Sequence, residues 1–279
     1  MTSPLGLVTD STADLPPGLA QAESIAVVPA IVILDGTSYE DGGELTRPEF
    51  YRRLPGLRRP ATTAAPPVAA FESVYDRWLS SGIGQVISVH LSQKFSGMYE
   101  IASQAARLFG ERVHVVDSGQ VSLGLGFQVL EAARAARAGA AVQGVLQTIE
   151  NARQRVRTIA MIENLDYLRR SGRVGWMRSS LGNLMHVRLL LEVADGLIRR
   201  LGQVRTRHRA IDELLSIATR WGPVRRWGVM HSAAEEEARQ LAARLPAAED
   251  NASPLIVDVT TVIGAHVGPN CLGLAGLLR

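Results

Sequence analysis

Short apolar segments alternate with longer helical patterns through the first half of this 279-residue chain, and this alternation constrains its fold more than any other feature. Apolar segments of strand length lie at residues 5–8, 25–34, 86–91 and 113–116, and helical periodicity occupies residues 67–80, 97–109, 120–138 and 142–154. Strand, polar loop and helix in repetition predict a parallel sheet whose carboxyl-end loops face a ligand. Residues 1–156 are therefore predicted to form a Rossmann-like α/β lobe.

The second half has a different order of patterns and is predicted to form an α+β lobe over residues 157–279. The Asp195-Gly196 pair separates two apolar segments and indicates a β-hairpin. Further strands are predicted at 158–163, 227–231 and 255–262, and helices at 164–171, 206–221 and 233–245. Neither a flexible linker nor a repeat separates the halves. We therefore expect a two-lobed α/β protein with its ligand cleft between the lobes.

Composition places the chain among globular proteins. Hydrophobic residues make up 46% and charged residues 20%. No apolar run approaches the ~18 residues that a membrane span requires. Cys271 is the only cysteine, which excludes an internal disulfide and a cysteine-based zinc site. Because the first residues lack a basic segment followed by an apolar stretch, we expect a cytoplasmic protein.

The positive charge does not favour a nucleic-acid partner. The net charge is +3 and the pI is near 9.4, but Lys94 is the only lysine among 30 basic residues, which indicates a general bias toward arginine. The arginine-rich stretches at 52–59 and 220–226 contain no recognisable reading motif and are interpreted as solvated surface. A DNA-binding regulator stays an alternative on charge alone, although no helix-turn-helix is evident.

The usual catalytic motifs are absent from the sequence. It has no Gly-Lys-Ser/Thr phosphate loop, no HExxH zinc motif and no GxSxG elbow. Gly124-Leu125-Gly126 has two glycines at the spacing of a dinucleotide-binding loop, but it lacks the third and falls at a predicted helix start. We therefore expect no catalytic residues, no cofactor and no metal site.

Three segments that precede predicted helices contain small hydroxyl residues and are candidate anion sites. They hold Ser11, the pair Thr62-Thr63, and Ser96 followed by Gly97. Exposed N–H groups at a helix start and a hydroxyl donor favour an anion, and Gly97 lets a ligand approach the backbone. For any one segment alone, a cap of its own helix is the simpler interpretation.

His266 is the candidate ligand histidine. It lies between Gly264 and Gly268 in a segment predicted to be a loop, where the glycines allow the imidazole to come close to a bound group. A lone histidine in a loop is more often structural than functional. The other histidines show no metal-ligand spacing.

Seven segments carry a resemblance to a known family, and they occur in the family's order. They are Thr9–Leu15, Tyr39–Tyr51, the Thr63 segment, Ser92–Tyr99, Val116–Ser118, Leu168–Val174 and Ile263–Pro269. In them the chain resembles the DegV family of bacterial fatty-acid-binding proteins over essentially its whole length. The resemblance implies a lipid tunnel between the two lobes and no catalytic activity of the protein's own.

The resemblance also assigns roles to residues. The carboxylate of one long-chain fatty acid would be held by Thr63, Ser96 with Gly97, and His266. Further ligand-loop candidates are Thr62, Ser11 and Gly264. The chain departs from the family at Ala64-Ala65, where Ser-Gln is usual, and at Met98 and Asn270, so polar groups beside the carboxylate site are lost.

A partner protein follows from the same resemblance. An ATP-dependent fatty acid kinase would convert the presented acid to an acyl phosphate for phospholipid metabolism. Arg173, in the Leu168–Val174 segment, is the candidate for contact with this kinase. Transient contact with a membrane surface is expected as well.

The proposed residue types suit a fatty acid because two hydroxyls and one imidazole donate hydrogen bonds without adding two fixed charges. Burial of ~15 methylenes at ~0.8 kcal/mol each contributes about 12 kcal/mol before ordering costs, so the tunnel would supply affinity and the polar groups selection. The pattern does not assign the tunnel wall among apolar candidates such as Met161, Met185 and Leu189.

A Ser–His hydrolase of a lipid-like ester is the alternative function. Ser96 would be its nucleophile and His266 its base. Such an enzyme needs a carboxylate that orients the histidine, and Asp10 and Asp117 are the candidates. Nothing in the spacing of these residues demands this arrangement.

Overall fold

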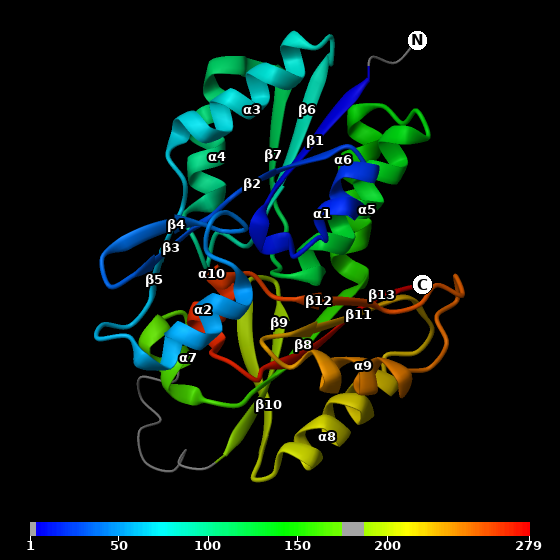
Figure 1. The fold of residues 1–279 in the computed structure, drawn as a ribbon. Helices are drawn as coiled ribbons and strands as arrows, with labels where there is room; N and C mark the ends of the chain where they lie inside the picture. The colour runs from blue at the N-terminus through cyan, green and yellow to red at the C-terminus, as the bar shows by residue number, and fades with distance from the viewer. Residues whose placement is uncertain (1–3, 175–186) are drawn as a thin grey trace.

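The structure is a computed structural model that describes residues 4–174 and 187–279. Figure 1 shows two lobes along the long axis of the molecule, each with its own sheet. The chain passes from the first lobe to the second where α6 (Val142–Arg155) ends and β8 (Val156–Ile162) begins. The expected boundary between residues 156 and 157 thus falls at the start of β8.

The N-terminal lobe is built on a parallel sheet with strand order β2-β1-β6-β7. Its strands are β1 (Leu5–Asp10), β2 (Ile25–Val28), β6 (Gln85–His90) and β7 (Val113–Asp117). Its helices are α1 (Pro17–Ala22), which connects β1 to β2, α3 (Val68–Ser80), α4 (Met98–Ala106) and α5 (Leu123–Arg137). Helices α3 and α4 cover one face, and α5 and α6 cover the other (Figure 1). Because the chain leaves β1 and β6 toward opposite sides, the crevice at their carboxyl ends is the expected ligand site of such a sheet.

A three-stranded antiparallel sheet with the order β4-β3-β5 projects from this lobe. Its elements, with the helix beside it, are β3 (Ile31–Leu34), β4 (Thr37–Glu40), β5 (Thr62–Ala64) and α2 (Arg47–Arg53). The apolar run at residues 25–34 is therefore two strands in two sheets, separated at Pro29.

Thr62 and Thr63 lie in β5 and pair with β3. The sequence places these residues in a loop before a helix at 67–80; the helix is found, but the expected loop is a strand. Two prolines follow, and α3 begins only after Pro67. Proline restricts the residue before it to extended conformations, which leaves the preceding segment free to pair as a strand.

The C-terminal lobe contains a six-stranded mixed sheet with the order β10-β9-β8-β13-β11-β12. Its remaining elements are β9 (Arg188–Ala194), β10 (Leu197–Val204), α8 (Arg207–Thr219), β11 (Val224–His231), α9 (Glu235–Ala243), β12 (Leu255–Asp258) and β13 (Leu272–Leu278). Only β11 and β12 pair in parallel among the described strands of this sheet. Helices α8 and α9 cover its outer face, and α5 and α6 of the other lobe pack against its inner face (Figure 1).

The predicted fold class is confirmed: a parallel α/β lobe is joined to a mixed α+β lobe. The Asp195-Gly196 hairpin is confirmed as well, with φ angles of 51° and 68° at the two turn residues. Strand β13 was not predicted, although it lies between β8 and β11. Its glycines obscure the alternation of a strand, and they allow close packing, since a Cβ at Gly276 would lie 2.9 Å from the Trp221 ring.

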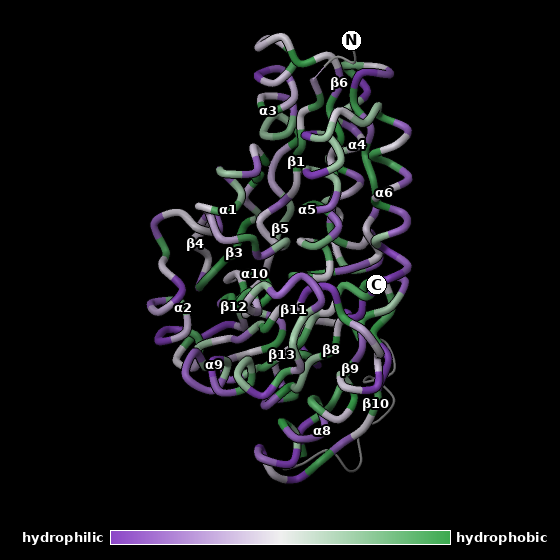
Figure 2. The backbone as a smooth tube through the Cα atoms, turned by 90° about the vertical axis from the view of Figure 1, so that its right-hand side faces the viewer, coloured by the Kyte–Doolittle hydropathy of each residue, from purple (hydrophilic) through white to green (hydrophobic). Residues whose placement is uncertain are grey.

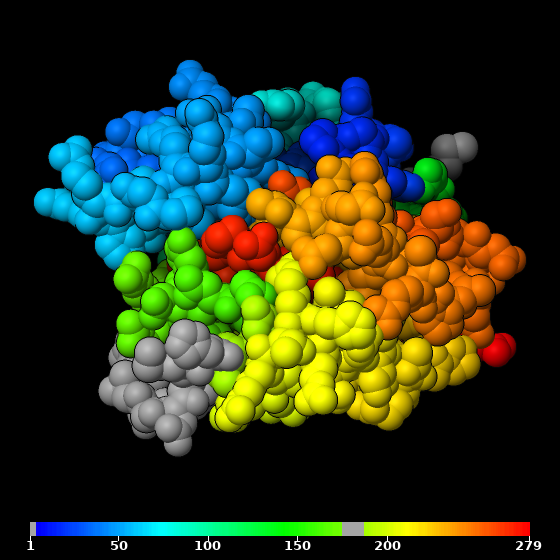
Figure 3. Space-filling view, turned by 60° about the horizontal axis from the view of Figure 1, so that its bottom comes forward, coloured from blue at the N-terminus to red at the C-terminus, as the bar shows by residue number. Residues whose placement is uncertain are grey.

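The segment around His266 is helix α10 (Thr261–Val267), so the prediction of a loop is wrong. The Thr260 hydroxyl caps the helix by accepting the Ile263 N–H at 3.3 Å, and Gly268 ends it with φ at 75°. Helix α10 packs against α7 (Leu165–Ser171) on one side and against β3, β5 and α2 on the other. In Figure 3 the red segment at this end of the chain lies between the cyan N-terminal lobe and green α7.

One apolar core runs through both lobes. Its main cluster joins Val8 and Val86 of the first sheet to Met230 and Ala275 of the second. Figure 2 shows hydrophobic residues along the strands and an alternation of hydrophobic and hydrophilic residues along α6. The shared core fixes the two sheets relative to one another, which matters because the ligand cavity lies between them.

Candidate functional site

A cavity of about 230 Å³ lies between the carboxyl ends of the N-terminal sheet and the inner face of the C-terminal sheet. The turns after β1 and β6 and the start of α5 form one wall, and β8, β9, β13 and α10 form the other. Most of the lining is apolar, as in Leu91, Phe95, Met98, Ile162, Leu191 and Met230. This inner cavity therefore suits a hydrocarbon chain.

Two of the apolar wall candidates named from the sequence, Met161 and Leu189, do not line the inner cavity. Met161 belongs to a separate core cluster with Leu214 of α8, on the outer face of the sheet. Leu189 packs with Ile162 behind the cavity wall. Met185 lies outside the described residues.

Thr63, Ser96, Gly97 and His266 all line the inner cavity, and Thr63 and His266 lie together at the end that borders a second space. The Thr63 Oγ1 and His266 Nε2 atoms are hydrogen-bonded at 2.9 Å, although the residues stand 203 positions apart in the sequence. Ser96 Oγ accepts the N–H of Met98 at 3.3 Å, which leaves its hydroxyl proton able to point into the cavity. No atom lies within 4 Å of the place where a Cβ at Gly97 would stand, so a ligand can approach the backbone there.

Helix α10 is held by buried carboxylates of the N-terminal lobe at its start. Asp14 accepts the N–H of Thr260 at 2.8 Å, and Asp41 accepts the N–H and hydroxyl of Thr261 at 2.9 and 2.7 Å. The first N–H groups of a helix lack partners within the helix, and the carboxyl oxygens of Asp14 and Asp41 accept two of them. These contacts join the lobes and fix the helix that carries His266.

Packing fixes the middle and the end of the same helix. A Cβ at Gly264 would lie 2.5 Å from the Tyr51 hydroxyl, and a Cβ at Gly268 would lie 2.4 Å from the Tyr167 ring. The glycines thus permit close contact with aromatic rings of α2 and α7. Gly264 faces Tyr51 and does not line the cavity, so the structure gives it a packing role.

His266 lies in a setting that favours its neutral form. Burial is the main cause that lowers its pKa to about 4, and the positive charge of Arg173 acts in the same direction. The imidazole is therefore neutral near pH 7 and can donate one hydrogen bond and accept another. It resembles the two hydroxyls beside it in carrying no charge.

Arg173 stands at the same end of the cavity. It lines the inner cavity, and its guanidinium donates to the carbonyl oxygens of Ser171 at 2.6 Å and of Phe95 at 3.4 Å. Its backbone N–H donates to the Ser171 hydroxyl at 3.2 Å. The residue is exposed at its other side, so it borders both the cavity and solvent.

A second, outer basin of about 630 Å³ shares Thr63, Ser171, Arg173 and His266 with the inner cavity. Arg58, Arg59 and Arg170 line this basin, and Thr62 lies in its wall. The Thr63–His266 pair thus borders both the inner, apolar space and a basin lined by arginines. Among the sequence candidates, Ser11 lies outside both, since its Oγ accepts the Ala30 N–H at 3.1 Å. Its neighbour Thr12 lines the inner cavity instead.

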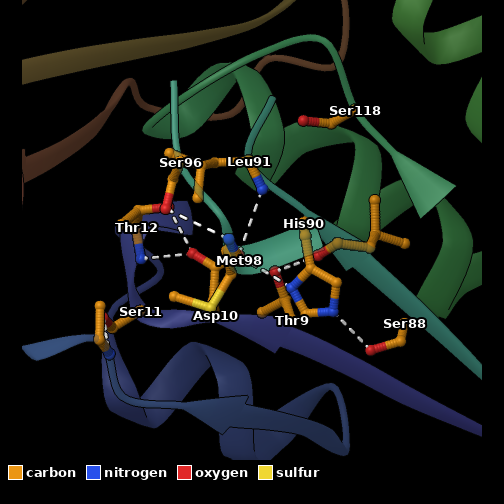
Figure 4. A network of polar contacts seen from close by, with 12 residues as sticks. Thr9, Asp10, Ser11, Thr12, Ser88, His90, Leu91, Ser96, Met98 and Ser118 are labelled. Carbon is orange, nitrogen blue, oxygen red and sulfur yellow. Dashed lines mark hydrogen bonds and ion pairs between the residues drawn. The ribbon is translucent and has the colours of Figure 1, made fainter. Parts of the chain in front are cut away.

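A buried polar network lies under this wall of the cavity (Figure 4). Asp10 accepts from the His90 Nδ1 at 2.9 Å, from the Leu91 N–H at 3.2 Å, and from the N–H and hydroxyl of Thr12. The His90 Nε2 in turn lies 2.6 Å from the Ser88 hydroxyl, and Asp10, Ser88 and His90 are all 0% exposed. The network therefore orients Thr12 and Leu91, which line the cavity, while Asp10, Ser88 and His90 do not line it.

This network bears on the hydrolase alternative. Asp10, one candidate for orienting His266, is committed to His90, and Asp117 accepts the Gly119 N–H at 2.9 Å. Within residues 4–174 and 187–279, no carboxylate is hydrogen-bonded to His266. Ser96 is bonded to the Met98 N–H and not to an imidazole. The described geometry thus lacks the oriented base that a Ser–His hydrolase requires.

Two kinds of feature are absent from the described part of the chain. None of its helices is both long enough and apolar enough to cross a bilayer. In the same residues no three His, Cys, Asp or Glu side chains are grouped so that they could hold a metal ion.

The fold and the cavity define a class: a two-lobed α/β protein with an apolar cavity between its lobes, lined in part by Thr63, Ser96 and His266. A model of the family described as "Uncharacterised protein, DegV family" matches residues 4–278. The chain belongs to the DegV family.

Relatives and solved structures agree with this assignment. A DegV domain-containing protein of Streptomyces coelicolor is 36% identical over 277 residues, which cover 98% of each chain. A structure of a fatty-acid-binding DegV family protein from Thermus thermophilus is 32% identical, with a TM-score of 0.88 over 99% of this chain and 100% of that one. DegV, a fatty acid binding protein from Bacillus subtilis, is 28% identical, with a TM-score of 0.88 over 100% of both chains.

Proposed function

We propose that this protein binds one long-chain fatty acid, with the hydrocarbon chain in the inner cavity and the carboxylate at Thr63, Ser96 and His266. The single observation that carries the proposal is the Thr63–His266 hydrogen bond at the junction of the apolar cavity and the arginine-lined basin. The family relatives that bind fatty acids support it.

Neutral donors can hold the carboxylate through a short relay. With its proton on Nε2, His266 donates to Thr63 Oγ1, and the Thr63 hydroxyl proton then points at the carboxylate. The Ser96 hydroxyl donates from the other wall of the cavity. Hydrogen bonds to a charged acceptor contribute roughly 1.5–3 kcal/mol each, so the group selects an ionised acid over an alcohol of the same length.

The protein acts in this proposal as a carrier without catalysis of its own and needs no cofactor. The acid head lies next to the outer basin, where a second protein can reach it. An ATP-dependent fatty acid kinase would form the acyl phosphate there, as a step in phospholipid metabolism, and Arg173 would contact that kinase. Because the kinase uses ATP, the proposal places both proteins in the cytoplasm, with transient contact with the membrane surface during exchange of lipid.

Arginines around the basin support an anionic partner. Arg58, Arg59, Arg170 and Arg173 border the space above the acid head. Guanidinium groups bind carboxylates and phosphates in bidentate geometry, which suits both an acidic protein surface and a phosphoryl group in transfer.

Organic extraction of the purified protein tests the proposal. A carrier should release fatty acid in a ratio near one per chain, and the delipidated protein should take up an equal amount of added acid. A hydrolase should instead turn over activated lipid esters, and this turnover should vanish in a Ser96→Ala variant. A protein that releases no acid and takes up none contradicts the proposal.

A further inference from the structure

The deep end of the inner cavity contains a hydroxyl group that has no hydrogen-bond partner. Thr158 lines the cavity, is 3% exposed, and its Oγ1 is unpaired. Among the described residues, it is the only one that both lines the inner cavity and has a buried side-chain N or O atom without a partner. An unsatisfied buried hydroxyl costs roughly 1–3 kcal/mol, so its place in an otherwise apolar wall calls for an explanation.

A second unpaired oxygen lies beside it. The Oε1 of Gln120 is buried without a partner, while the Nε2 of the same amide donates to the Val193 carbonyl at 3.0 Å and so fixes which end of the amide faces Thr158. A Cβ at Gly124 would lie 2.4 Å from Thr158 Oγ1 and 2.6 Å from Gln120 Oε1. The two oxygens are therefore neighbours, and glycine at position 124 keeps the room around them.

The strand geometry places this pair far from the carboxylate site. Thr158, Ala160 and Ile162 line the cavity from alternate positions of β8. Ile162 packs in one cluster with Leu168 and Val267, next to His266. Four residues of strand at about 3.3 Å each put Thr158 about 13 Å deeper than Ile162. A fatty acid whose carboxylate lies at His266 therefore reaches Thr158 with carbons that lie well beyond the first few of its acyl chain.

We infer that Thr158 and Gln120 form a polar subsite that accepts a hydroxyl group on the acyl chain, so that the cavity takes hydroxylated long-chain fatty acids as well as plain ones. This inference rests on the proposed function. Gln120 Oε1 can only accept a hydrogen bond, and Thr158 has a single proton to donate. A ligand hydroxyl adds the donor that completes the group, and it accepts or donates as its position requires.

A ketone does not complete the group in the same way. It brings an acceptor and no proton, so Thr158 can serve either the ketone or Gln120, and one acceptor stays unpaired. The subsite therefore distinguishes two ligands of nearly the same size and polarity. Discrimination of this kind is strong where a buried polar group would otherwise lose its partner.

The test is a set of competition titrations on the delipidated protein. The probes are stearic acid, hydroxystearic acids with the hydroxyl at successive positions from the middle of the chain to the tail, and the matching keto acids. For at least one position, the wild type should bind the hydroxy acid about tenfold more tightly than its keto partner. In Thr158→Val, which keeps the shape and removes the hydroxyl, this ratio should fall to about one, and Thr158→Ser should restore it.

A matched control separates the subsite from general effects of the substitution. Thr9→Val also removes a buried hydroxyl, one that donates to the Val89 carbonyl at 2.8 Å outside the cavity lining, and it should leave the ratio unchanged. If stearic acid binds but no hydroxy acid is preferred over its ketone, the subsite is refuted while the proposed function stands. If no acid binds, both are refuted.

Discussion

Two histidines of this protein each contact a small hydroxyl, and they differ in what surrounds them. His266 bonds Thr63 where the inner cavity meets the arginine-lined basin, whereas His90 bonds Ser88 and Asp10 in a network that is fully buried. Ser88, His90 and Asp10 are the residue types of a catalytic triad, but they are fully buried and a substrate cannot reach them. Thr63 and His266 line the cavity, where a ligand can reach them, but no carboxylate of the described residues is bonded to His266. Access, and not residue type, therefore decides which of them can bind a ligand.

The two sets also do different work for the fold. The Asp10 network ties the ends of β1 and β6 together at the place where a parallel sheet of this kind binds ligands. The Thr63–His266 pair depends on the Asp10 network indirectly, because the network positions Thr12 and Leu91, which line the same cavity. We expect substitutions in the Asp10 network to lower the free energy of unfolding, and substitutions in the Thr63–His266 pair to lower the affinity for the fatty acid.

The largest effect is expected from Asp10→Ala. The change leaves His90 and the N–H groups of Thr12 and Leu91 without their acceptor, and removing one partner of such a buried set costs about 3–5 kcal/mol. Chemical denaturation should report this loss. Asp117→Ala, which removes an acceptor of one N–H outside the network, should cost much less; equal losses would contradict the structural role of Asp10.

The pH dependence of stability tests the anchor of α10. Burial raises the pKa of Asp14 to about 7, against opposing effects of Arg47, Ser122 and Thr260. The folded state then holds a proton that the unfolded state releases, so this contribution is present below the unfolded pKa and is lost as pH rises toward 7. We expect Asp14→Asn to remove a decline of roughly 2–4 kcal/mol between pH 4 and pH 7.

His266 titrates in the opposite sense and must be separated from this effect. Its lowered pKa means that stability falls as pH falls from the unfolded value toward 4, since the unfolded state binds the proton first. The difference between the wild type and Asp14→Asn, measured by denaturation at several pH values, isolates the carboxyl. The unfolding free energy of the wild type minus that of the variant should fall as pH rises toward 7, and a rise would contradict the raised pKa of Asp14.

Affinity should depend on His266 by a smaller amount. His266→Ala should weaken binding of a long-chain acid about tenfold to hundredfold, because the relay to Thr63 is lost, while the free energy of unfolding changes by about 1 kcal/mol or less. Fluorescence competition and denaturation give the two readings. His114→Ala, on β7 and outside both cavities, serves as the control.

The smallest effect on lipid binding is expected from Arg173→Ala. The side chain borders the cavity, but its hydrogen bonds go to backbone carbonyls, so acid affinity should change less than threefold. If the proposed kinase partner contacts this residue, the rate of acyl phosphate formation should fall. Arg169→Ala, which removes a nearby cation of α7 that pairs with Asp166, should leave that rate unchanged. A normal rate in Arg173→Ala would remove this residue from the kinase interface.

The sequence predicted the lobes well because their signals are local. Strand and helix periods, the Asp195-Gly196 turn and the prolines before α3 each act over a few residues. Strand β13 was not predicted because its glycines pack closely against the side chains of Met230 and Trp221, which lie far away in the sequence. The helix at His266 escaped because its start is held by Asp14 and Asp41, more than 200 residues earlier.

The candidate site could be anticipated only in part. Hydroxyls in segments before predicted helices mark Thr63 and Ser96, a histidine between glycines marks His266, and the structure brings all three to one cavity. The wall could not be assigned, since Met161 and Thr158 stand on the same strand and face opposite ways. Thr12 was missed beside Ser11 because a short 3-10 turn decides which of the two faces the cavity.

The central claim is that neutral donors at the junction of the cavity and the basin select the carboxylate of a long-chain acid. Titration of the delipidated protein with such an acid, and with the alcohol of the same length, tests it directly. We predict one site per chain and at least tenfold tighter binding of the acid at pH 7, a preference that disappears in His266→Ala. Equal affinity of the wild type for acid and alcohol would contradict the claim.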